Sequence, residues 1–504
     1  MSDAGADAEA VALSLISHTN AGKTTLARTL LGRDVGEVRD AAHVTQEAVR
    51  YPMIETAAGD VLVLWDTPGF GDSVRLARRL AQQGNPIGWF LSEVWDRYRD
   101  RAFWLSQQAV RNVRDQADVV LYLVNASEAP ADAGYLAPEL SVLEWIGKPV
   151  IVLLNQLGRP RPSAEEAAEE ARWRSALGAR AIVRDVIAMD AFARCWVQEI
   201  ELLRVIEPAL PEARRVTYGR LVSAWQQRRF DQFGEAMDAI AAPIAQAACD
   251  SESVPDSGMK GALRDLGRAI GYARDGGDEF KQRASAALAT RLDQALRAST
   301  DRLIAIHGLE GHASAEVLAR LSEGQAVDAP VSEGKAAMMG GVVSGALTGL
   351  VADLAAGGFT FGAGILTGAV LGALGGAGIA RGMNLARGSS GATLRWDDAF
   401  LGGLVAPAIL RYLAVAHYGR GRGEWVKTEY PAFWQPLVTR IVAAHAGQLA
   451  RVWSQRQPSC NADAVVAGLR PIMMQATRAV LDELYPGTLA QAEQRAAPLT
   501  PPLA

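Results

Sequence analysis

Short apolar runs alternate with stretches of helical periodicity over residues 8–205. The runs predict strands at Ala10–Ile16, Val49–Thr56, Val61–Trp65, Val119–Val124, Val150–Leu154 and Ala181–Ala188. Helices are predicted between most of them, for example at Ala137–Ile146 and Ala164–Leu177. This alternation indicates a mainly parallel sheet with helices on both faces. Only a short segment around Gly59 separates the second and third runs, so these two predict a hairpin at one edge of the sheet.

The strand pattern ends near residue 205. Leu221–Ala248 and Met259–Ile306 carry apolar residues at spacings of three and four, with a polar break at Asp250–Gly258. We therefore expect a helical bundle or stalk over residues 206–330. Residues 391–504 are again mostly helical in pattern, and their proline-rich end, Pro498–Ala504, is expected to be a frayed tail.

Residues 336–380 are apolar in a different way, because they hold thirteen glycines and a single charged residue, Asp353. Met338–Ala356 and Ala363–Ala380 are predicted to be the two arms of a helical hairpin, and each has roughly the 18–20 residues that cross a bilayer. Glycine every fourth residue lets two helices pack closely in lipid. The glycines in this pattern are Gly341, Gly345, Gly349, Gly364, Gly368, Gly372 and Gly376.

Three interpretations of this hairpin stay open. It is a two-helix membrane segment, an element buried in the helical domain, or a stored hairpin that inserts on a nucleotide signal. Each glycine in a water-exposed helix costs about 1 kcal/mol relative to alanine, which favours the membrane. The basic flanks Lys335, Arg381 and Arg387 would place both ends in the cytoplasm.

Composition narrows the picture only slightly. The 504 residues suggest about three domains. The net charge of −5 gives no general reason to expect nucleic-acid binding. The acidic N-terminus lacks an apolar signal segment, so the N-terminal domain is expected in the cytoplasm. Cys195, Cys249 and Cys460 are widely spaced and are expected to be three buried thiols in a reducing compartment.

Two motifs carry chemistry. Residues 17–25 are a P-loop whose leading glycine is replaced by Ser17, and they lie between a predicted strand and a predicted helix, Thr24–Leu31, as the motif requires. Residues 66–70, Asp-Thr-Pro-Gly-Phe, form the turn that follows a nucleotide-binding strand. Together they predict that the protein binds a nucleoside triphosphate and hydrolyses it. The nucleotide-binding residues expected from them are Ser17, His18, Thr19, Asn20, Ala21, Gly22, Lys23, Thr24, Thr25, Asp66 and Gly69.

Each residue type suits its expected role. Loop N–H groups and the positive end of the following helix would surround the β-phosphate. Lys23 would place a charge at the β- and γ-phosphates, and the Thr24 hydroxyl would bind Mg²⁺. Asp66 would hold the same Mg²⁺ through water, and the Gly69 N–H would meet the γ-phosphate. Ser17 is tolerable if its backbone angles stay in an ordinary region.

These motifs, in this order, resemble the Era-like GTPases, the group that includes Era, EngA and TrmE, from residue 8 to about 190. The resemblance implies that Thr45 is the switch threonine that closes on Mg²⁺ and the γ-phosphate; a plain surface-loop threonine is the alternative. It implies that Asn20 coordinates K⁺, with two G domains meeting face to face in a homodimer; otherwise Asn20 only braces the loop. Phe70 stands where Ras-like proteins have a catalytic glutamine, so hydrolysis is not expected to use a glutamine from this position.

The base-recognition motif matches this group least. Asn155-Gln156-Leu157-Gly158 stands where the group has Asn-Lys-x-Asp. Asn155 and Gln156 are expected to contact the base, with Asn155 at the guanine N7 edge. The aspartate that accepts from guanine N1–H and N2–H₂ is replaced by Gly158, so guanine specificity rests on the resemblance. Residues 188–190 are a candidate for the next base-contact loop.

The stretch between Phe70 and Val119 is longer than a compact G domain needs. It combines aromatic residues with arginines, namely Trp89, Phe90, Trp95, Tyr98, Phe103, Trp104, Arg97, Arg99 and Arg101. We interpret it as an extra amphipathic helix packed on the protein's own helical region. The alternative is a switch-linked element that docks on a partner or a bilayer surface.

The expected architecture is an α/β P-loop GTPase domain at residues 1–205, followed by a largely α-helical region. That region comprises a helical domain or stalk at 206–330, the apolar hairpin at 331–390 and a C-terminal helical domain at 391–504. Era-like G domains joined to glycine-rich hairpins occur in bacterial proteins that this chain resembles.

The expected function is a membrane-associated switch that binds and hydrolyses GTP with Mg²⁺ on the cytoplasmic face of the bacterial inner membrane. GTP, GDP and the lipid bilayer are its expected partners, and no nucleic acid is expected. One alternative is a nucleotide-gated membrane structural or pore-forming protein with slow hydrolysis. Another is a soluble Era-like ribosome-assembly GTPase, although nothing after residue 205 resembles the basic RNA-binding module that such proteins need.

Overall fold

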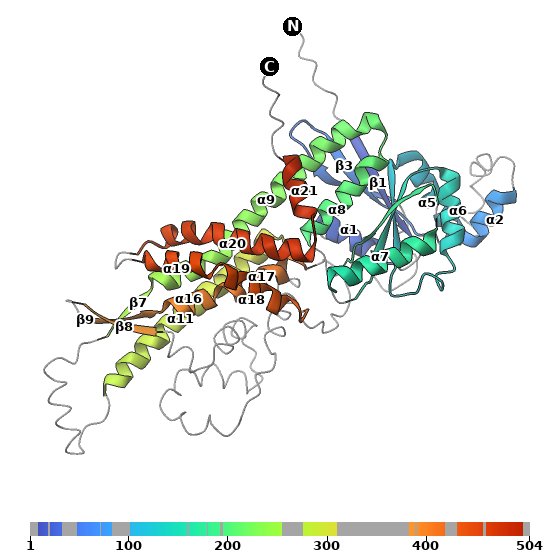
Figure 1. Cartoon of the computed structure of the whole chain (residues 1–504). Coiled ribbons are helices and arrows are strands. Elements are labelled where there is room, and N and C mark those ends of the chain that lie inside the picture. Colours follow the sequence, from blue (N-terminus) through green and yellow to red (C-terminus); the bar gives the residue numbers. More distant parts are fainter. Residues whose placement is uncertain are drawn as a thin grey trace, which may run out of the picture. The chain divides into compact units, whose positions relative to one another are not determined.

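The chain divides into two compact units in the computed structural model (Figure 1). The structure describes residues 9–18, 21–32, 48–70, 72–82, 101–158, 161–178, 180–191, 195–254, 276–309, 383–388, 391–418, 431–456 and 460–496. The first unit contains the described parts of Met1–Asp231, Ala416–Glu424 and Leu481–Ala504, and the second contains those of Gln232–Val415 and Trp425–Val480. The hairpin predicted at 336–380 lies outside the described residues.

A six-stranded sheet of order β2-β3-β1-β4-β5-β6 forms the centre of the first unit. Its strands are β1 (Ala10–Ser17), β2 (Val49–Glu55), β3 (Val61–Asp66), β4 (Val119–Asn125), β5 (Val150–Asn155) and β6 (Val183–Ala188). All neighbours pair in parallel except β2, which pairs antiparallel with β3 at the edge. The predicted parallel sheet with an edge hairpin is therefore confirmed.

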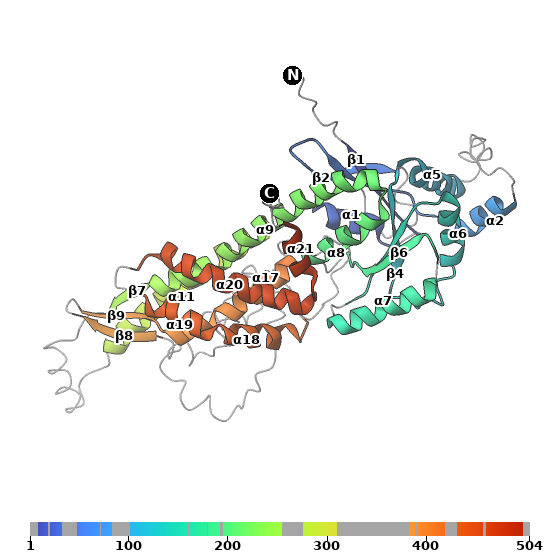
Figure 2. The same cartoon turned by 45° about the horizontal axis from the view of Figure 1, so that its top comes forward.

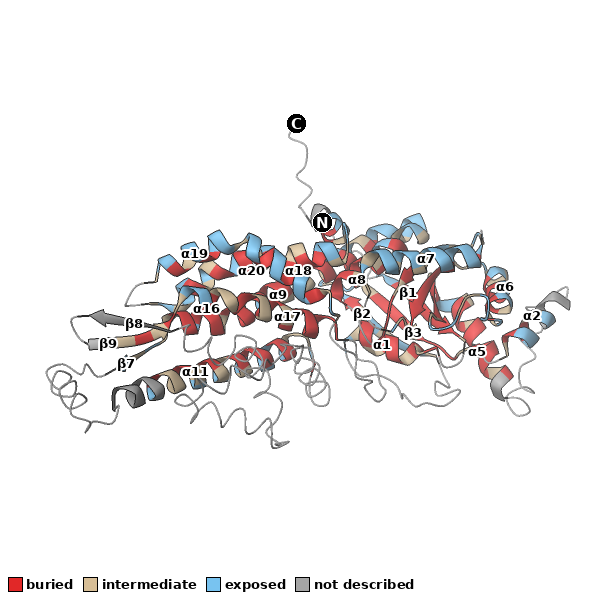
Figure 3. Cartoon of the chain, turned by 60° about the horizontal axis from the view of Figure 1, so that its bottom comes forward, coloured by how far each residue is buried: buried red, intermediate tan, exposed pale blue. Residues whose placement is uncertain are grey.

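Helices cover both faces of this sheet. One face buries a cluster that includes Ile16, Tyr122 and Val152 under residues of the helices α2 (Ser73–Gln82), α5 (Arg101–Gln116), α6 (Leu136–Ile146) and α7 (Ser163–Leu177). Helix α1 (Lys23–Leu31) packs on β1, β2 and β3 from the other face. Figure 3 shows β1 and β3 buried between these layers. Burial on both faces explains why these strands are nearly continuous apolar runs.

Helix α5 corrects the interpretation of the aromatic and arginine-rich stretch. Phe103 is fully buried in the sheet cluster and lies under the guanidinium of Arg75, 4.1 Å from its ring centre. Asn112 accepts a hydrogen bond from Ser14 in β1 at 3.1 Å. Residues 101–116 are thus a regular covering helix of the sheet, and the expectation that they pack on the helical region is wrong. The other aromatic residues of this stretch, at positions 89–98, lie outside the described residues.

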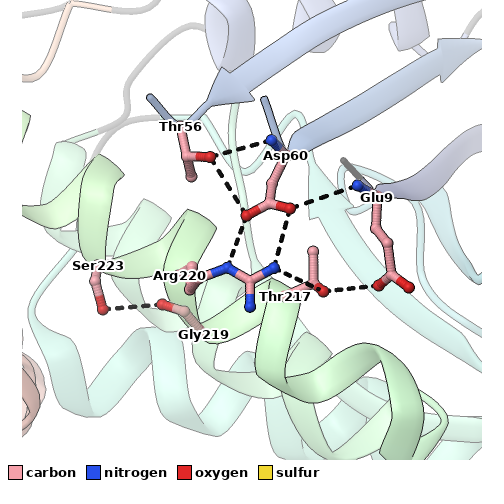
Figure 4. Close-up of polar contacts among 7 residues, drawn as sticks. All are labelled: Glu9, Thr56, Asp60, Thr217, Gly219, Arg220 and Ser223. Atoms are coloured by element: carbon pink, nitrogen blue, oxygen red, sulfur yellow. Dashed lines mark hydrogen bonds and ion pairs between the residues drawn. The ribbon is translucent and has the colours of Figure 1, made fainter. Parts of the chain in front are cut away.

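A set of polar contacts ties the first part of helix α9 (Glu212–Cys249) to the β2–β3 hairpin (Figure 4). Arg220 donates from Nε and Nη2 to the two carboxylate oxygens of Asp60, at 2.7 and 3.0 Å. Asp60 is buried and also accepts from Thr56, while Thr217 donates to Glu9 at 2.8 Å. We call Glu9, Thr56, Asp60, Thr217 and Arg220 the hairpin clamp.

The C-terminal end of the chain also belongs to the first unit. Helix α21 (Thr488–Ala496) packs against α8 (Trp196–Ile206). His417 and Tyr485 share a hydrogen bond of 2.8 Å between Nε2 and the phenol oxygen. The sequence pattern did not predict that these distant segments come together.

The second unit is mainly helical, as predicted. Its helices are the later part of α9, α11 (Gly276–Ile306), α16 (Asp398–Gly403), nearly all of α17 (Val405–Ala416), α18 (Trp434–Ala444), α19 (Ala446–Ser454) and most of α20 (Ala462–Leu484). Aromatic and aliphatic side chains form its core; Phe233 packs edge-on against Tyr412 with ring centres 5.7 Å apart. Among the residues that the structure describes, one continuous stretch, Asp398–Ala416, is long and apolar enough to cross a membrane, but 67% of its most apolar window is buried inside the structure. A soluble core helix would satisfy the same criterion.

A small antiparallel sheet in this unit was not predicted. Strands β7 (Ser251–Val254), β9 (Gly391–Trp396) and β8 (Met383–Gly388) pair in that order, with Ser251 opposite Arg395. The sheet lies beside α11 in both Figure 1 and Figure 2. Arg291 of α11 binds Asp250 through Nε at 2.8 Å and also pairs with Glu252, so the polar break expected at 250–258 begins with a strand anchored by ion pairs.

Two of the three cysteines are joined. Cys249 at the end of α9 forms a disulfide with Cys460, just before α20, with Cα atoms 5.1 Å apart. Cys195 is a buried thiol. The expectation of three separate thiols is therefore wrong, because 211 residues of chain return to bring Cys460 beside Cys249.

Candidate nucleotide-binding site

The turn from β1 to α1 has the geometry of a phosphate-binding loop. β1 ends at Ser17 and α1 begins at Lys23. Gly22 has φ 87°, a left-handed conformation, and its carbonyl accepts the first helical hydrogen bond from Leu26 N at 2.9 Å. Ser17 is in extended backbone, which meets the condition for replacing the usual glycine; among the described non-glycine residues, positive φ occurs at Gln156. The helix N-terminus therefore opens toward the loop.

Lys23 is buried at this turn and points back across it. Its ammonium donates to the Ser17 hydroxyl at 3.1 Å. Burial lowers the pKa of Lys23, while the nearby carboxylates of Asp66 and Glu139 act in the opposite direction. The cation is thus held inside the loop, where a β- or γ-phosphate would find it.

Thr24 and Asp66 form the expected metal-binding pair. The Thr24 hydroxyl donates to Asp66 Oδ2 at 2.7 Å. Asp66 is buried, its pKa is raised by that burial, and its other oxygen, Oδ1, has no hydrogen-bond partner among the described residues. A hydroxyl paired with a buried carboxylate, one oxygen of which has no hydrogen-bond partner among the described residues, fits a Mg²⁺ ion and its water shell. These residues therefore suit the metal that the motifs predict.

The segment after Asp66 is fixed against β1. Thr67 donates its hydroxyl to the Leu15 carbonyl at 2.8 Å, and the Phe70 N–H donates to the Ser17 carbonyl at 3.1 Å. Gly69 lies between these two anchors. Phe70 is fully buried, so its side chain faces the core and cannot orient a water molecule, in agreement with the absence of a glutamine there.

A buried carboxylate beside the loop was missed in the sequence. Glu139 of α6 accepts from Tyr122 OH at 2.6 Å and shares a 2.8 Å hydrogen bond with His18 Nδ1. The His18 ring also stacks on Tyr135, with centres 4.4 Å apart. Burial raises the pKa of Glu139. The signal was available, because position 139 falls on the same helical face as the apolar residues 136, 140 and 143.

Asn155 joins three loops at the opposite end of the site. Its Nδ2 donates to the Ala21 carbonyl at 2.9 Å, and its Oδ1 accepts from Ala191 N at 2.8 Å. Next to it, the Leu157 N–H donates to Asp190 Oδ2 at 2.8 Å. The structure thus brings the loop at 155–158, the P-loop and the loop after β6 together. The expected contact of Asn155 with guanine N7 stays a prediction.

Three of the predicted residues lie outside the described part of the chain. They are Thr19 and Asn20 of the P-loop and the switch threonine Thr45. Their roles therefore stay predictions. Thr25 is described and is buried in the first turn of α1.

Two protein-family models match the chain. A family described as a domain of unknown function (DUF3482) matches residues 174–464, which is more than half of the chain. The chain belongs to this family. A second model, described as a 50S ribosome-binding GTPase, matches residues 13–156 and so covers the P-loop, Asp66 and Asn155. None of the curated proteins matches the chain.

Solved GTPase structures resemble the DUF3482 protein over part of its length. An Aquifex aeolicus Era variant bound to GDP and AlF₄⁻ is 19% identical over 40% of this chain and 57% of its own, with a TM-score of 0.30. Era in complex with MgGDPNP and a segment of 16S ribosomal RNA is also 19% identical, over 41% and 58%, with a TM-score of 0.30. A probable GTP-binding protein, EngB, is 15% identical over 36% and 89%, with a TM-score of 0.23. The chain thus spans little more than half the length of the two Era structures.

The N-terminal region is accordingly a P-loop GTPase domain, and the region after it is mainly helical. The predicted fold class is confirmed. The finer assignment to the Era-like branch stays a prediction.

Proposed function

We propose that the protein is a membrane-associated switch that binds and hydrolyses GTP and passes its nucleotide state to the helical region. One observation carries the nucleotide part. Buried Lys23 and the Thr24–Asp66 pair lie at the loop from which α1 begins, and Asp66 Oδ1 has no hydrogen-bond partner in the part of the chain that the structure describes. This arrangement suits the phosphates of a nucleoside triphosphate.

In hydrolysis, water attacks the γ-phosphorus and the bond to the β–γ bridging oxygen breaks. Lys23 would stabilise the negative charge on the phosphates, and the loop N–H groups would orient them. Thr24 and Asp66 would hold Mg²⁺, which when bound neutralises charge on the β- and γ-phosphates. Because Phe70 is buried, the group that orients the water must come from elsewhere. Thr45 and Asn20 are our candidates.

Asn20 leads to a finer proposal. If it holds K⁺ beside the phosphates, the ion would act where other GTPases use an arginine, with two G domains paired face to face. This proposal rests on the resemblance of the P-loop alone. Equal turnover in KCl and NaCl at matched ionic strength would count against it.

The hairpin clamp supports a coupling role for α9. The β2–β3 hairpin directly follows the segment that contains Thr45 and ends at Asp66, so it lies between the two predicted switches in the chain. The clamp fixes this hairpin to α9, whose residues from Gln232 onward belong to the second unit. A change at the switches would therefore reach a helix that both units share.

The membrane part of the proposal rests on residues 336–380 and their basic flanks. We place the protein on the cytoplasmic face of the bacterial inner membrane, with the lipid bilayer as partner. Resistance of the protein to salt extraction from membranes tests this part.

The nucleotide part is tested by calorimetric titration with GTP, GDP and ATP, and by turnover. Lys23→Ala should remove measurable triphosphate binding, because the buried loop loses its cation. Lys148→Ala is the matched control, since Lys148 precedes β5 at the other end of the parallel strands. Unchanged GTP affinity in Lys23→Ala would refute the site. Binding without turnover would instead favour the slow, nucleotide-gated alternative.

A further inference from the structure

Guanine presents two adjacent donors, the N1–H and the N2 amine, whereas adenine presents an acceptor at N1. A carboxylate that accepts from both donors therefore favours guanine over adenine. The loop that would hold the base, residues 155–158, consists of Asn, Gln, Leu and Gly and contains no carboxylate. If the protein selects GTP, the acidic group must come from another segment.

The loop after β6 supplies such a group. β5 and β6 are parallel neighbours with Leu154 opposite Ala188, so the segments that follow them leave the same edge of the sheet. Ligands of open α/β sheets bind at this carboxyl edge. Asp190 lies there, only 6% exposed, and its Oδ2 accepts from Leu157 N at 2.8 Å.

We propose that Asp190 supplies the carboxylate that recognises guanine, in place of an aspartate at position 158. The proposal rests on the GTP-binding function proposed above. A carboxylate has two oxygens with about four lone pairs and can accept several hydrogen bonds at once, and the bond from Leu157 fixes this carboxylate beside Gly158. The neighbouring bond from Ala191 N to Asn155 Oδ1 holds the same loop against the residue expected at guanine N7.

Gly158 provides the space that this arrangement needs. Its φ of 83° is left-handed, and a Cβ built on it would meet no atom of the described residues within 4 Å. Position 158 is thus open on the side where a side chain would extend. In this proposal, the carboxylate that recognises guanine lies on the loop after β6, which is hydrogen-bonded to the loop at 155–158, instead of at position 158 itself.

Glu166 of α7 is a rival acid, because its charge interacts with that of Asp190. It accepts from Arg161 N at 3.4 Å, and its pKa is raised mainly by burial, with the charges of Glu170 and Asp190 adding to the effect. Glu166 is therefore close to Asp190, but its carboxylate accepts from Arg161, which lies just before α7. It serves as the matched control.

The test compares GTP, XTP and ATP binding by calorimetry in wild type and Asp190→Asn. Xanthine carries a carbonyl at C2 where guanine carries an amine, so an amide at position 190 can donate where the carboxylate accepted. We expect GTP to bind roughly 10- to 100-fold more weakly and XTP to bind more tightly by a comparable factor. ATP should be unchanged. The GTP-to-XTP ratio is independent of the folded fraction.

Equal weakening of all three nucleotides would show that Asp190 only holds the loop, and would overturn the proposal. So would an unchanged GTP-to-XTP ratio, or a switch to XTP in Glu166→Gln. A rescue adds a second test: Asp190→Ser should lose GTP preference, and Gly158→Asp in that background should restore it. Failure of the rescue counts against the proposal.

The same titrations separate the proposed role of Asp190 from the proposed GTP-binding function on which it rests. If wild type binds GTP and needs Lys23 to do so, but Asp190→Asn leaves the GTP-to-XTP ratio unchanged, only the role of Asp190 is refuted. A wild type that binds no triphosphate refutes both.

Discussion

At the scale of the residue, Gly22 meets two separate geometric demands. Its backbone is left-handed, and a Cβ there would come within 2.7 Å of Asn155 Nδ2. Asn155 Nδ2 is the amide that holds the Ala21 carbonyl. A glycine is therefore needed both for its φ and for the close approach of another loop. The side chain of Lys23 can then turn back toward Ser17 inside the closed loop.

Asp66→Asn tests the metal pair at this scale. The amide can still accept from Thr24, but the negative charge beside the orphaned oxygen is lost. In wild type, EDTA should weaken GTP binding. In Asp66→Asn, the ratio of the GTP affinity in Mg²⁺ to the GTP affinity in EDTA should be smaller by roughly tenfold or more. Calorimetry with Mg²⁺ and with EDTA measures it. Asp72→Asn, which alters a carboxylate that accepts from Arg75 N, is the control. The same Mg²⁺ effect in Asp66→Asn and wild type would refute the pair.

The sequence predicted the residues whose partners are near in the chain or belong to a fixed motif. Lys23 and Thr24 with Asp66 are of this kind, because P-loop chemistry sets their types and order. Glu139 was missed and Asp190 was named only as part of a candidate base-contact loop, because the partner of each lies in another loop: His18 for Glu139 and Leu157 for Asp190. Such pairings depend on which strands are neighbours in the sheet, and residue spacing does not contain that information.

At the scale of the element, the strands buried on both faces were predicted from their apolar runs, and the largely exposed edge strand β2 was predicted from its closeness in the chain to β3. Strands covered on both faces are continuous apolar runs, so they were found; β7 reads Ser-Glu-Ser-Val and has no such pattern. Its partner β9 lies far along the chain, and the pairing follows from tertiary structure. Helix α5 was predicted as a helix but assigned to the wrong surface, because its amphipathic pattern does not say which surface it covers.

The hairpin clamp gives a pH-dependent prediction. The hydrogen bond from Arg220 lowers the pKa of Asp60 below its usual 3.8. The folded state then binds fewer protons than the unfolded state, so this stabilisation is complete well above pH 3.8 and is lost as the pH falls through the lowered value. Asp60→Asn should lower the melting temperature of the first unit by a constant amount above about pH 5. That difference should shrink at more acidic pH.

Thermal unfolding across this pH range, followed by circular dichroism, tests the clamp. Asp115→Asn is the control, because its pair with Arg114 is exposed and such pairs contribute little. A melting difference for Asp60→Asn that does not change with pH would mean that charge is not what holds the clamp.

The disulfide should stabilise the second unit. It closes a loop of 211 residues, and disulfides of native domains contribute roughly 2–5 kcal/mol. Cys460→Ser should therefore lower the denaturant midpoint and remove the effect of reductant on unfolding. Cys195→Ser, which leaves the bond intact, should keep that effect. A wild type that is indifferent to reductant, with three titratable thiols, would contradict the bond.

At the scale of the whole molecule, the order of segments along the chain was the most informative property of the sequence. The GTPase match ends at residue 156 and the DUF3482 match spans 174–464, so the predicted hairpin lies within the family region. In the proposed switch, the nucleotide state would be passed through the helices of that region to the predicted hairpin.

The hairpin prediction decides whether that action takes place in a membrane. If Met338–Ala380 lies in a bilayer, the full-length protein should pellet with membranes and resist high-salt and alkaline extraction. A variant lacking residues 336–380 should be soluble and still bind GTP. Gly345→Leu and Gly368→Leu should stay membrane-bound, because leucine is compatible with lipid, but should weaken the contact between the arms by removing the close approach. The opposite result has two parts: salt alone releases the wild type from membranes, and the leucine variants are soluble but unfolded. Together these results would show that the hairpin is a buried core element.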